Sequence, residues 1–525
     1  MKLRHLLLLT ASLLILTTPV AAQETVSPTA MTLDRALATI TEKECYDNVQ
    51  VLAAQSMGGR GTLTPGFEQA AQFVEQQLEI LGYTPANGES FRHPVSLNCV
   101  VAGEESHFLV SGLGDEVETL VVEQDFVPVI GSRERAASGE AVFIGYAIDS
   151  KKNKWSDVKK KDVKGKIVFA FSREPFADNP KSKKFDGTAA TRESEVAMKA
   201  KAVMDAGAIA LVLIPDPGLV ADDTLPLPGM VPFVDSRGGG PVAFQRRLNL
   251  PDIPVMSVSR AVAGRIFDKD FTKEHASIDK KKKAKSIKAK KGVTLQLGVE
   301  WASASRETFN LAALLKGSSD SGEVVVVGAH LDHVGYDVMS DNMRLQVYPG
   351  ADDNASGSAA LLEVAQALSG TTPECDILFL WFTGEELGLL GSNAYCDDPI
   401  FPHKNTVAMF NMDMVGRGER KVINIGGLWD RPGWEKLIKD THKRIKSPLK
   451  MDNKQGRDLY ARSDQFSFHQ KGVVGLFFFE ADLNSNKVYH KPGDIAETID
   501  GKKMESIAKL FTACVWVVAH EGARP

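Results

Sequence analysis

The sequence predicts an α/β fold: a mostly parallel mixed sheet flanked by helices, with a smaller α+β domain inserted into it. At 525 residues the chain exceeds the size at which a single core usually stops growing, about 250 to 300 residues. From about residue 307 onwards, strand-like and helix-like segments alternate, and between residues 119 and 266 the pattern changes to short β-rich runs. Together these observations predict a main domain interrupted by a second, smaller one.

The first residues, MKLRHLLLLTASLLILTTPVAAQ, follow the pattern of a secretory signal peptide. Basic residues come first, then an apolar core, then small residues, and cleavage after Ala22 fits this order. A membrane anchor would need about 20 apolar residues, and this core is shorter and interrupted by threonines and a proline. We therefore expect residues 1–22 to be removed and the protein to be exported, either to the periplasm or out of the cell, with no membrane-spanning segment left.

Residues 23–118 form the predicted N-terminal part of the main domain. The segment GFEQAAQFVEQQLEILGY, residues 66–83, repeats apolar residues at helical spacing and ends at Gly82. The preceding GGRGTLTPG has the composition of a loop.

Residues 119–266 are predicted to be the inserted domain. Short strands such as AVFIGYAI, GKIVFAF and AIALVLI are accompanied by one plausible helix, ESEVAMKAKAVMDAG. A lysine-rich connection, residues 267–306, follows and contains the run DKKKKAKSIKAKK. This run is typical of a solvated loop or helix end, and contact with an anionic surface or polymer is the alternative.

Residues 307–525 are predicted to be the main part of the principal domain. The segments EVVVVGAH, DILFLWF and VAMFNMDMVG are predicted strands, and helices are expected between them. In such sheets functional groups gather outside the carboxyl ends of the strands.

The composition narrows the classes of partner and of metal ligand. The formal net charge of −5 predicts no nucleic acid partner. The cysteines are odd in number, none stands in a C-x-x-C arrangement, and their pairing cannot be deduced, so they are poor metal ligands. They are Cys45, Cys99, Cys375, Cys396 and Cys514.

Histidines and acids follow several predicted strands. Imidazole and carboxylate ligands together suit zinc, and two metals sharing a bridging carboxylate is a natural arrangement for so many groups. The adjacent Glu385 and Glu386 can divide the work, because neighbouring side chains point in different directions: one binds metal and the other acts as a base. The candidate residues are His330, Asp332, His333, Asp352, Asp353, Glu385, Glu386, Asp413 and His490.

Six motifs in this order resemble the co-catalytic zinc peptidase family that includes bacterial leucyl aminopeptidase, aminopeptidase Y and glutamate carboxypeptidase II. Residues 119–266 resemble the protease-associated domain that many members carry, which is expected to contact substrate or a protein partner. The resemblance implies an aminopeptidase that acts on peptides and holds two Zn²⁺ per chain. The motifs are GAHLDHVG, PGADDNASG, FTGEELGLLGS, NMDMVGR, RSDQFSF and VYHKPGD.

The resemblance also implies which residues hold the metals. Asp352 would bridge both zincs, His330 and Asp413 would complete one ion, and Glu386 and His490 the other.

Three further roles follow from the same resemblance. Glu385 would be the general base that takes a proton from the water between the metals and passes it to the leaving amine. Asp332 would orient His330 through its other ring nitrogen. Tyr460 would stabilise the oxyanion.

Gln465 and His333 lie outside the ligand set that the resemblance implies. The chain has Gln465 where many relatives have histidine, which puts one substrate-side contact in doubt, and His333 is interpreted as a pocket-wall residue. Arg457 and Arg462 keep open a carboxypeptidase or dipeptidase that recognises a C-terminal carboxylate. The same motifs also leave open a non-catalytic binding module and a glutaminyl cyclase that holds one zinc.

Overall fold

The computed structural model describes residues 31–525, except 178, 180, 186–190, 219, 221, 227–232, 235–249, 338–345, 453–455 and 481–485. The predicted signal peptide, residues 1–22, lies outside the described residues. Within the described part, no helix combines the length and the apolar character needed to cross a membrane.

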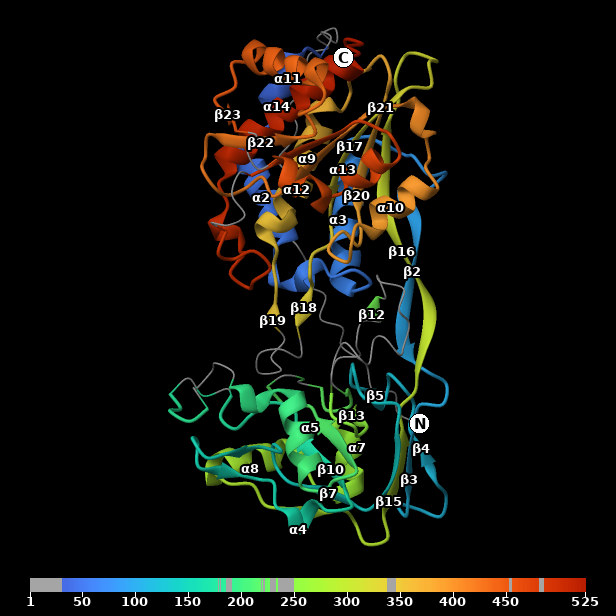
Figure 1. Ribbon diagram of the computed structural model, residues 1–525, viewed down its shortest axis with the longest axis vertical. Helices are drawn as coiled ribbons and strands as arrows, with labels where there is room; N and C mark the ends of the chain where they lie inside the picture. The colour runs from blue at the N-terminus through green and yellow to red at the C-terminus, as the bar shows by residue number, and fades with distance from the viewer. Residues whose placement is uncertain are drawn as a thin grey trace, which may run out of the picture.

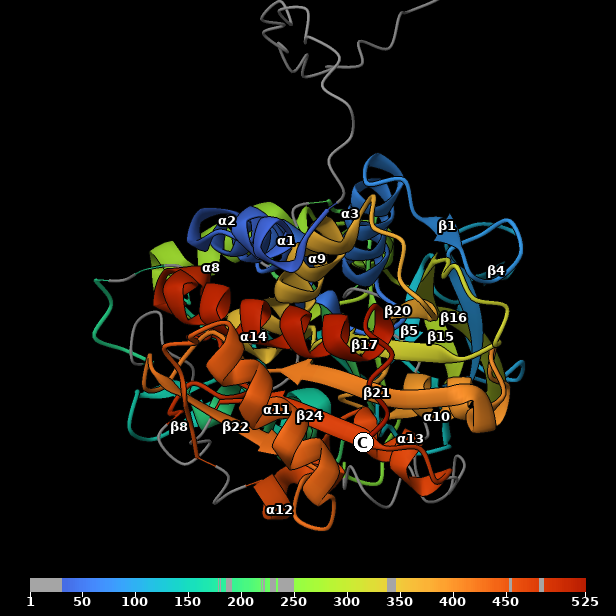
Figure 2. The same ribbon diagram turned by 90° about the horizontal axis from the view of Figure 1, so that it is seen from above.

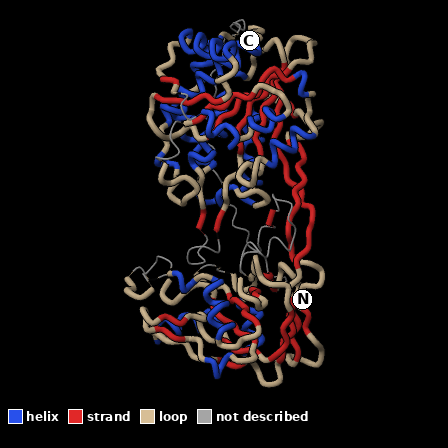
Figure 3. Tube along the Cα trace, viewed as in Figure 1, coloured by secondary structure: helices blue, strands red, loops and turns tan. Residues whose placement is uncertain are grey.

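Two lobes are joined by a pair of long strands (Figure 1). Strands β2 (Arg92–Ala102) and β16 (Trp301–Leu315) pair antiparallel along most of their length, from Trp301 opposite Ala102 to Leu311 opposite Arg92. The larger lobe contains the N-terminal helices and everything that follows β16, and the smaller lobe is formed by residues between the two strands in sequence, apart from β12 (Phe233–Val234), which pairs with β2. Figure 3 shows this strand pair as the continuous link from one lobe to the other.

The larger lobe is built on a ten-stranded mixed sheet with the order β12-β2-β16-β20-β17-β21-β24-β22-β23, and β1 pairs with β16. Its four central strands are parallel and buried, apart from the half-buried Val407, as expected for near-continuous apolar runs such as DILFLWF. The outer pairings are antiparallel except β22 with β23. The central strands are β20 (Asp376–Phe382), β17 (Val324–His330), β21 (Thr406–Asp413) and β24 (Gly475–Phe479); the others are β1 (Thr84–Pro85), β12 (Phe233–Val234), β22 (Val422–Gly426) and β23 (Lys450–Met451).

Helices cover both faces of this sheet, as the sequence predicts (Figure 2). The helix predicted at residues 66–83 is α3, which begins after Thr64, whose Oγ1 accepts the Phe67 N–H, and buries Phe67, Val74 and Leu78. One face carries α1 (Leu33–Thr39), α2 (Glu42–Leu52), α3 (Pro65–Ile80), α9 (Gly357–Leu368) and α14 (Gly501–Ala519), with α11 (Pro432–Arg444) against α14, and the other carries α10 (Leu390–Asp397) and α13 (Gln465–Gln470).

The smaller lobe combines two sheets with short helices. A six-stranded sheet has the order β14-β7-β10-β11-β13-β5 and is parallel except at its two ends, and a four-stranded antiparallel sheet has the order β4-β3-β15-β6. The strands are β3 (His107–Ser111), β4 (Glu118–Thr119), β5 (Phe126–Pro128), β6 (Ala136–Gly139), β7 (Ala141–Phe143), β10 (Ile167–Phe171), β11 (Ala210–Ile214), β13 (Val255–Val258), β14 (Ile287–Lys288) and β15 (Thr294–Gly298), with the separate hairpin β8 (Asp149–Ser150) and β9 (Trp155–Ser156). The helices are α4 (Lys160–Val163), α5 (Val196–Asp205), α7 (Arg260–Phe267) and α8 (Phe271–Lys281).

The predicted boundaries of the inserted domain, 119 and 266, are too narrow. Strands β3 and β15 pair with each other inside the smaller lobe, although both lie outside that range. Much of the predicted connection, 267–306, also belongs to this lobe, because α8 packs on α7 and β14 pairs with β7. The predicted boundaries follow the change to short β-rich runs, and this change does not coincide with the limits of the smaller lobe. β2 and β16 run from one lobe into the other without any break in their strand pattern.

A buried polar cluster lies in the core of the smaller lobe. Arg173 and Asp216 form an ion pair with side chains that are almost completely buried, and His275 Nε2 lies 2.9 Å from Asp216 Oδ2. Lys199 is fully buried, and its ammonium donates to the carbonyl oxygens of Phe171 (3.3 Å) and Arg173 (2.6 Å). Burial lowers the pKa of Lys199 to about 7.

The His275 interaction predicts a pH-dependent contribution to stability. Burial lowers the pKa of His275, but the hydrogen bond and charge of Asp216, with Asp279 adding to and Arg173 opposing them, leave it above its ordinary value. The stabilisation is therefore complete below the ordinary pKa of about 6.5 and is lost as pH rises through the raised folded-state value. Replacing His275 by phenylalanine keeps a ring against Phe171 and removes the charge.

We expect His275→Phe to lower the free energy of unfolding by about 1 to 2 kcal/mol at pH ~5.5 and by clearly less at pH ~9. Denaturant unfolding at the two pH values measures the difference. His107→Phe, in the same lobe, is the control. An equal loss at both pH values would show that the imidazolium does not contribute.

Candidate metal centre

The parallel strands bring the predicted polar residues to one edge of the large sheet. β17 ends at His330, β21 ends at Asp413, and Glu385 and Glu386 follow closely after β20. These strands are neighbours in the order β20-β17-β21, so their carboxyl ends lie side by side. The segment that leads into α9 adds Asp353, and a loop after β24 adds a further histidine.

Two groups of side chains at this edge could each hold a metal ion, and Asp353 belongs to both. Asp353 Oδ1 lies 3.4 Å from His330 Nε2, and Asp353 Oδ2 lies 3.0 Å from His490 Nε2. One carboxylate thus presents one oxygen to each group, which is the geometry of a bridging ligand. The first group is His330, Asp353 and Asp413; the second is His333, Asp353, Glu386 and His490.

Unsatisfied buried atoms show that these residues fit a cation. His330 Nε2 and Asp413 Oδ1 are buried 3.4 Å apart, and within the described residues neither makes a hydrogen bond. Buried polar atoms are normally hydrogen-bonded, so atoms that converge without bonding to one another are typical of ligands around an ion. A set of imidazole nitrogens and carboxylate oxygens suits zinc better than calcium.

The predicted bridging role of Asp352 is wrong. Asp352 Oδ1 accepts the Gly416 N–H (2.8 Å), and its own N–H donates to the Asp494 carboxylate (3.1 Å), so the side chain belongs to neither ligand group. Asp353, the next residue, is the one that belongs to both candidate groups. The two acids are adjacent in sequence, but their side chains point to different sides of the backbone.

Asp332 positions Glu385 more directly than it positions His330. His330 Nδ1 lies 3.0 Å from the carbonyl oxygen of Asp332, whereas the Asp332 carboxylate is 3.9 Å away from that nitrogen. The carboxylate instead accepts the Glu385 N–H (3.2 Å) and the Thr62 hydroxyl (3.0 Å). The predicted orienting contact is thus made by the backbone, and the carboxylate fixes the turn that carries the two glutamates.

Glu385 lies beside the first ligand group without belonging to it. Its Oε2 lies 3.9 Å from His330 Nε2, and the residue is in neither candidate ligand group. Burial raises the pKa of its carboxyl well above the ordinary value, His330 opposes this shift, and Asp413 adds to it. A carboxylate with a raised pKa is the better proton acceptor for general base catalysis.

His333 is itself a member of the second candidate ligand group. Its Nδ1 lies 2.6 Å from Glu386 Oε1, and its ring packs edge-on against that of His490. It also lines a second cavity of about 750 Å³ beside Glu386, together with Tyr336, Leu387 and Ile130 of the smaller lobe. The predicted pocket-wall residue is therefore a candidate ligand as well.

The oxyanion role predicted for Tyr460 is wrong in this structure. The Tyr460 hydroxyl is buried and donates to the carbonyl oxygen of Gly475 (2.9 Å). Gln465, which stands where many relatives have histidine, is also buried and accepts from Asn411 (2.9 Å), so it is part of the core. The tyrosine that does face the site is Tyr489, immediately before His490 in VYHKPGD.

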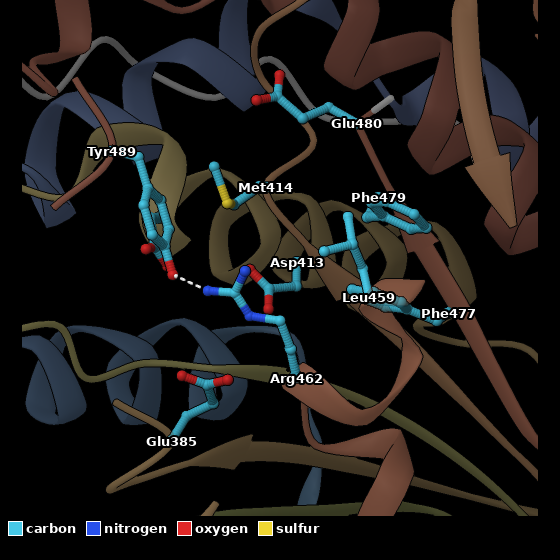
Figure 4. A pocket seen from close by; sticks show the side chains of 10 residues that line it. Glu385, Asp413, Met414, Leu459, Arg462, Phe477, Phe479, Glu480 and Tyr489 are labelled. Carbon is cyan, nitrogen blue, oxygen red and sulfur yellow. Dashed lines mark hydrogen bonds between the residues drawn. The ribbon is translucent and has the colours of Figure 1, made fainter. Parts of the chain in front are cut away.

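A pocket of about 400 Å³ adjoins the first ligand group (Figure 4). Arg462 and Tyr489 lie on one side, where Arg462 Nη2 donates to the Tyr489 hydroxyl (3.0 Å), and the Tyr489 ring stacks on His490. The apolar wall is Met414, Leu459, Phe477 and Phe479; the carboxylates are Asp353, Glu385, Asp413 and Glu480.

Arg60, in the predicted loop GGRGTLTPG, supports the site from behind. It is fully buried, and its guanidinium donates to the carbonyl oxygens of Leu331 (2.9 Å), Pro349 (2.7 Å) and Gly350 (2.9 Å). These carbonyls belong to the two segments that carry the histidines at 330 and 333 and the aspartate at 353. In the sequence Arg60 is marked only by the glycines on either side of it, and this pattern does not predict that the side chain supports the site.

The fold and the site define a chain with two adjoining groups of histidines and acids, candidate metal ligands, at the carboxyl edge of a mixed α/β sheet. A family model described as peptidase family M28 matches residues 310–515 of the chain. All the candidate metal ligands lie within that segment.

The curated relatives that match part of the chain include proteins named as aminopeptidases. The probable leucine aminopeptidase of Arthroderma otae is 34% identical over 218 residues, covering 40% of this chain and 57% of that protein. Aminopeptidase YwaD of Bacillus subtilis is 29% identical over 210 residues, covering 39% and 43%. The chain spans about half the length of the curated relatives it matches. A solved zinc aminopeptidase from Bacillus subtilis covers 92% of this chain and 97% of its own, with 20% identity and a TM-score of 0.47.

Proposed function

We propose that the protein is a di-zinc aminopeptidase that removes apolar N-terminal residues from peptides. The observation that carries this proposal is the position of Asp353, which offers one carboxylate oxygen to each of two ligand groups. His330 and Asp413 would complete one zinc site, and Glu386 and His490, with His333 beside them, the other. When bound, the metals would polarise the scissile carbonyl and acidify the attacking water.

The side chains around the metals would carry the proton transfers and hold the substrate. Glu385 would take a proton from the attacking water and deliver it to the leaving amine, a transfer made possible by the turn that Asp332 fixes. Tyr489 and Arg462 lie on the same side of the pocket, where they can donate to the carbonyl oxygen as negative charge develops on it.

The pocket supports exopeptidase rather than endopeptidase action. Its aromatic and aliphatic wall is suited to an apolar first side chain. Glu480, a lining carboxylate that is neither a candidate ligand nor the proposed base, would favour a substrate amine over a C-terminal carboxylate. The second cavity, beside Glu386, would receive the peptide beyond the scissile bond.

We also propose that the chain is exported, and that the smaller lobe corresponds to a protease-associated domain. Export is supported by the pattern of residues 1–22. For the lobe, support comes from its α+β composition, from its insertion between β2 and β16, and from Ile130, which it contributes to the second cavity.

Blocking the substrate amine tests the proposed function. We expect Leu-nitroanilide to be hydrolysed at least a hundredfold faster than its N-acetyl derivative, because acetylation removes the charge that the Glu480 carboxylate would bind. Glu-nitroanilide should also be poor, because the wall is apolar. Equal rates on free and blocked substrates would contradict the aminopeptidase proposal, and preference for C-terminal dipeptides would favour a carboxypeptidase.

A further inference from the structure

Two lysine-rich segments of the smaller lobe have no part in the proposed catalysis. Residues 151–166 contain eight lysines and two aspartates, and residues 280–291 contain eight lysines and no acid. We call these two segments the basic tip. The rest of the chain holds 46 basic and 65 acidic residues, so a strongly basic region is attached to an acidic body.

The two segments are far apart in sequence and adjacent in space. Ser286 Oγ donates to Asp162 Oδ2 (2.8 Å), and β14 pairs antiparallel with β7, just before the first segment. Ala284, in the turn between α8 and β14, packs against Gly145, which comes shortly before the first segment. A Cβ added at Gly145 would lie only 2.4 Å from the Ala284 Cβ. The fold therefore combines both runs of lysine into one surface.

Nearly all of the positive charge faces solvent. All sixteen lysines are exposed except Lys166, which is half-buried. Lys166 and Lys290 form ion pairs with Glu140 (3.2 Å) and Asp268 (3.8 Å), both outside the tip. Within the tip, the two aspartates are turned inward or bonded: Asp157 is buried and accepts the Tyr146 N–H, and Asp162 accepts from Ser286.

The position of the tip separates it from the metal centre. α4, which lies in the first segment, is at the end of the smaller lobe farthest from the larger lobe, and α8, which leads into the second, is in the same half of the lobe (Figure 1). The candidate ligands all belong to the larger lobe. A surface bound at the tip would therefore leave the active-site pocket uncovered.

The chemistry of the tip favours a flat anionic surface over a nucleic acid. Neither segment contains arginine, the residue that reads bases and phosphates with two hydrogen bonds, and the one aromatic residue, Trp155, is buried and cannot stack on a base. The elements at the tip are a hairpin of two-residue strands, a single helical turn and an edge strand. None of them has a shape that fits the groove of a nucleic acid. Lysines that act only as point charges are the usual means of adsorption to anionic lipid headgroups.

We propose that the basic tip docks the protein on an anionic lipid bilayer surface, with the larger lobe held away from it. The acidic body reinforces this orientation, because an anionic surface repels it while attracting the tip. Each lysine near such a surface strengthens binding about fivefold, and added salt screens the attraction.

Vesicle co-sedimentation of the full chain tests the proposal. We expect binding to vesicles with about equal phosphatidylcholine and phosphatidylglycerol in ~0.05 M salt, at least tenfold weaker binding to phosphatidylcholine alone, and release in ~0.5 M salt. The variant Lys159→Glu, Lys161→Glu, Lys285→Glu should bind the anionic vesicles at least tenfold more weakly than the unaltered chain. Its hydrolysis of a soluble peptide substrate should be unchanged.

A matched control separates the tip from net charge. Lys404→Glu, Lys421→Glu, Lys443→Glu makes the same change in charge at exposed positions of the larger lobe and should bind within about twofold of the unaltered chain. Equal losses in both variants, or no binding by the unaltered chain, would overturn the proposal. Tighter binding to heparin or to duplex DNA than to the anionic vesicles at the same salt would also overturn it, by identifying a polymer as the occupant.

Discussion

Replacing Glu385 by alanine is expected to lower kcat on Leu-nitroanilide by about a thousandfold or more while leaving the metal content unchanged. Its carboxylate faces the site but belongs to neither ligand group, so the substitution removes a base and no ligand. General base catalysis by a placed carboxylate typically contributes a hundredfold to ten-thousandfold in rate. Steady-state kinetics and metal analysis of the same preparation measure both quantities.

The matched variant is Glu386→Ala, which removes the neighbouring carboxylate that lies 2.9 Å from His490 and 2.6 Å from His333. It should lose metal as well as activity. If Glu385→Ala lost its metals and Glu386→Ala kept them, the two roles would have to be exchanged.

Asp353→Asn and Asp352→Asn are expected to differ sharply, although the two residues are neighbours. Asp353→Asn removes the charge shared by the two ligand groups, so metal bound per chain should fall below one and turnover should drop by at least a thousandfold. Asp352→Asn should retain its metals, because an amide oxygen can still accept the Gly416 N–H. Metal analysis after gel filtration distinguishes the two outcomes.

Thermal unfolding should accompany that comparison, since both residues are buried. A variant that remains folded and binds no metal identifies a ligand, whereas one that unfolds does not. Retention of both metals by Asp353→Asn, with loss from Asp352→Asn, would restore the assignment that the sequence motif suggested.

Much of the fold could be predicted because buried strands and helices show regular patterns of apolar residues in the sequence. Strands β17 and β20 are buried on both faces and therefore appear as unbroken apolar runs, and α3 shows its buried face as a helical repeat. The limits of the smaller lobe could not be predicted in the same way. β2 and β16 belong to both lobes, and nothing in their alternating pattern marks the point where one lobe ends.

The site was predictable in its residue types and less so in its geometry. His330, Glu386, Asp413 and His490 could be recognised because each follows a strand or lies in a distinctive motif, and the structure places all four in the candidate ligand groups. Which of two adjacent aspartates faces the metals depends on backbone torsion, and no pattern in GADDNASG encodes it.

The two tyrosines illustrate the same limit. Tyr460 lies close to the SD pair in sequence, but a hydrogen bond to Gly475 holds its hydroxyl in the core. Tyr489 faces the pocket because it immediately precedes His490 and stacks on its ring.

Zinc titration of the chelated protein tests the paired metal centre most directly. Turnover of Leu-nitroanilide should be abolished by chelation and should return as Zn²⁺ is added, reaching its plateau at two equivalents per chain, because Asp353 links two ligand groups. Full activity after chelation, or a plateau at one equivalent with no further zinc bound, would contradict a two-metal aminopeptidase.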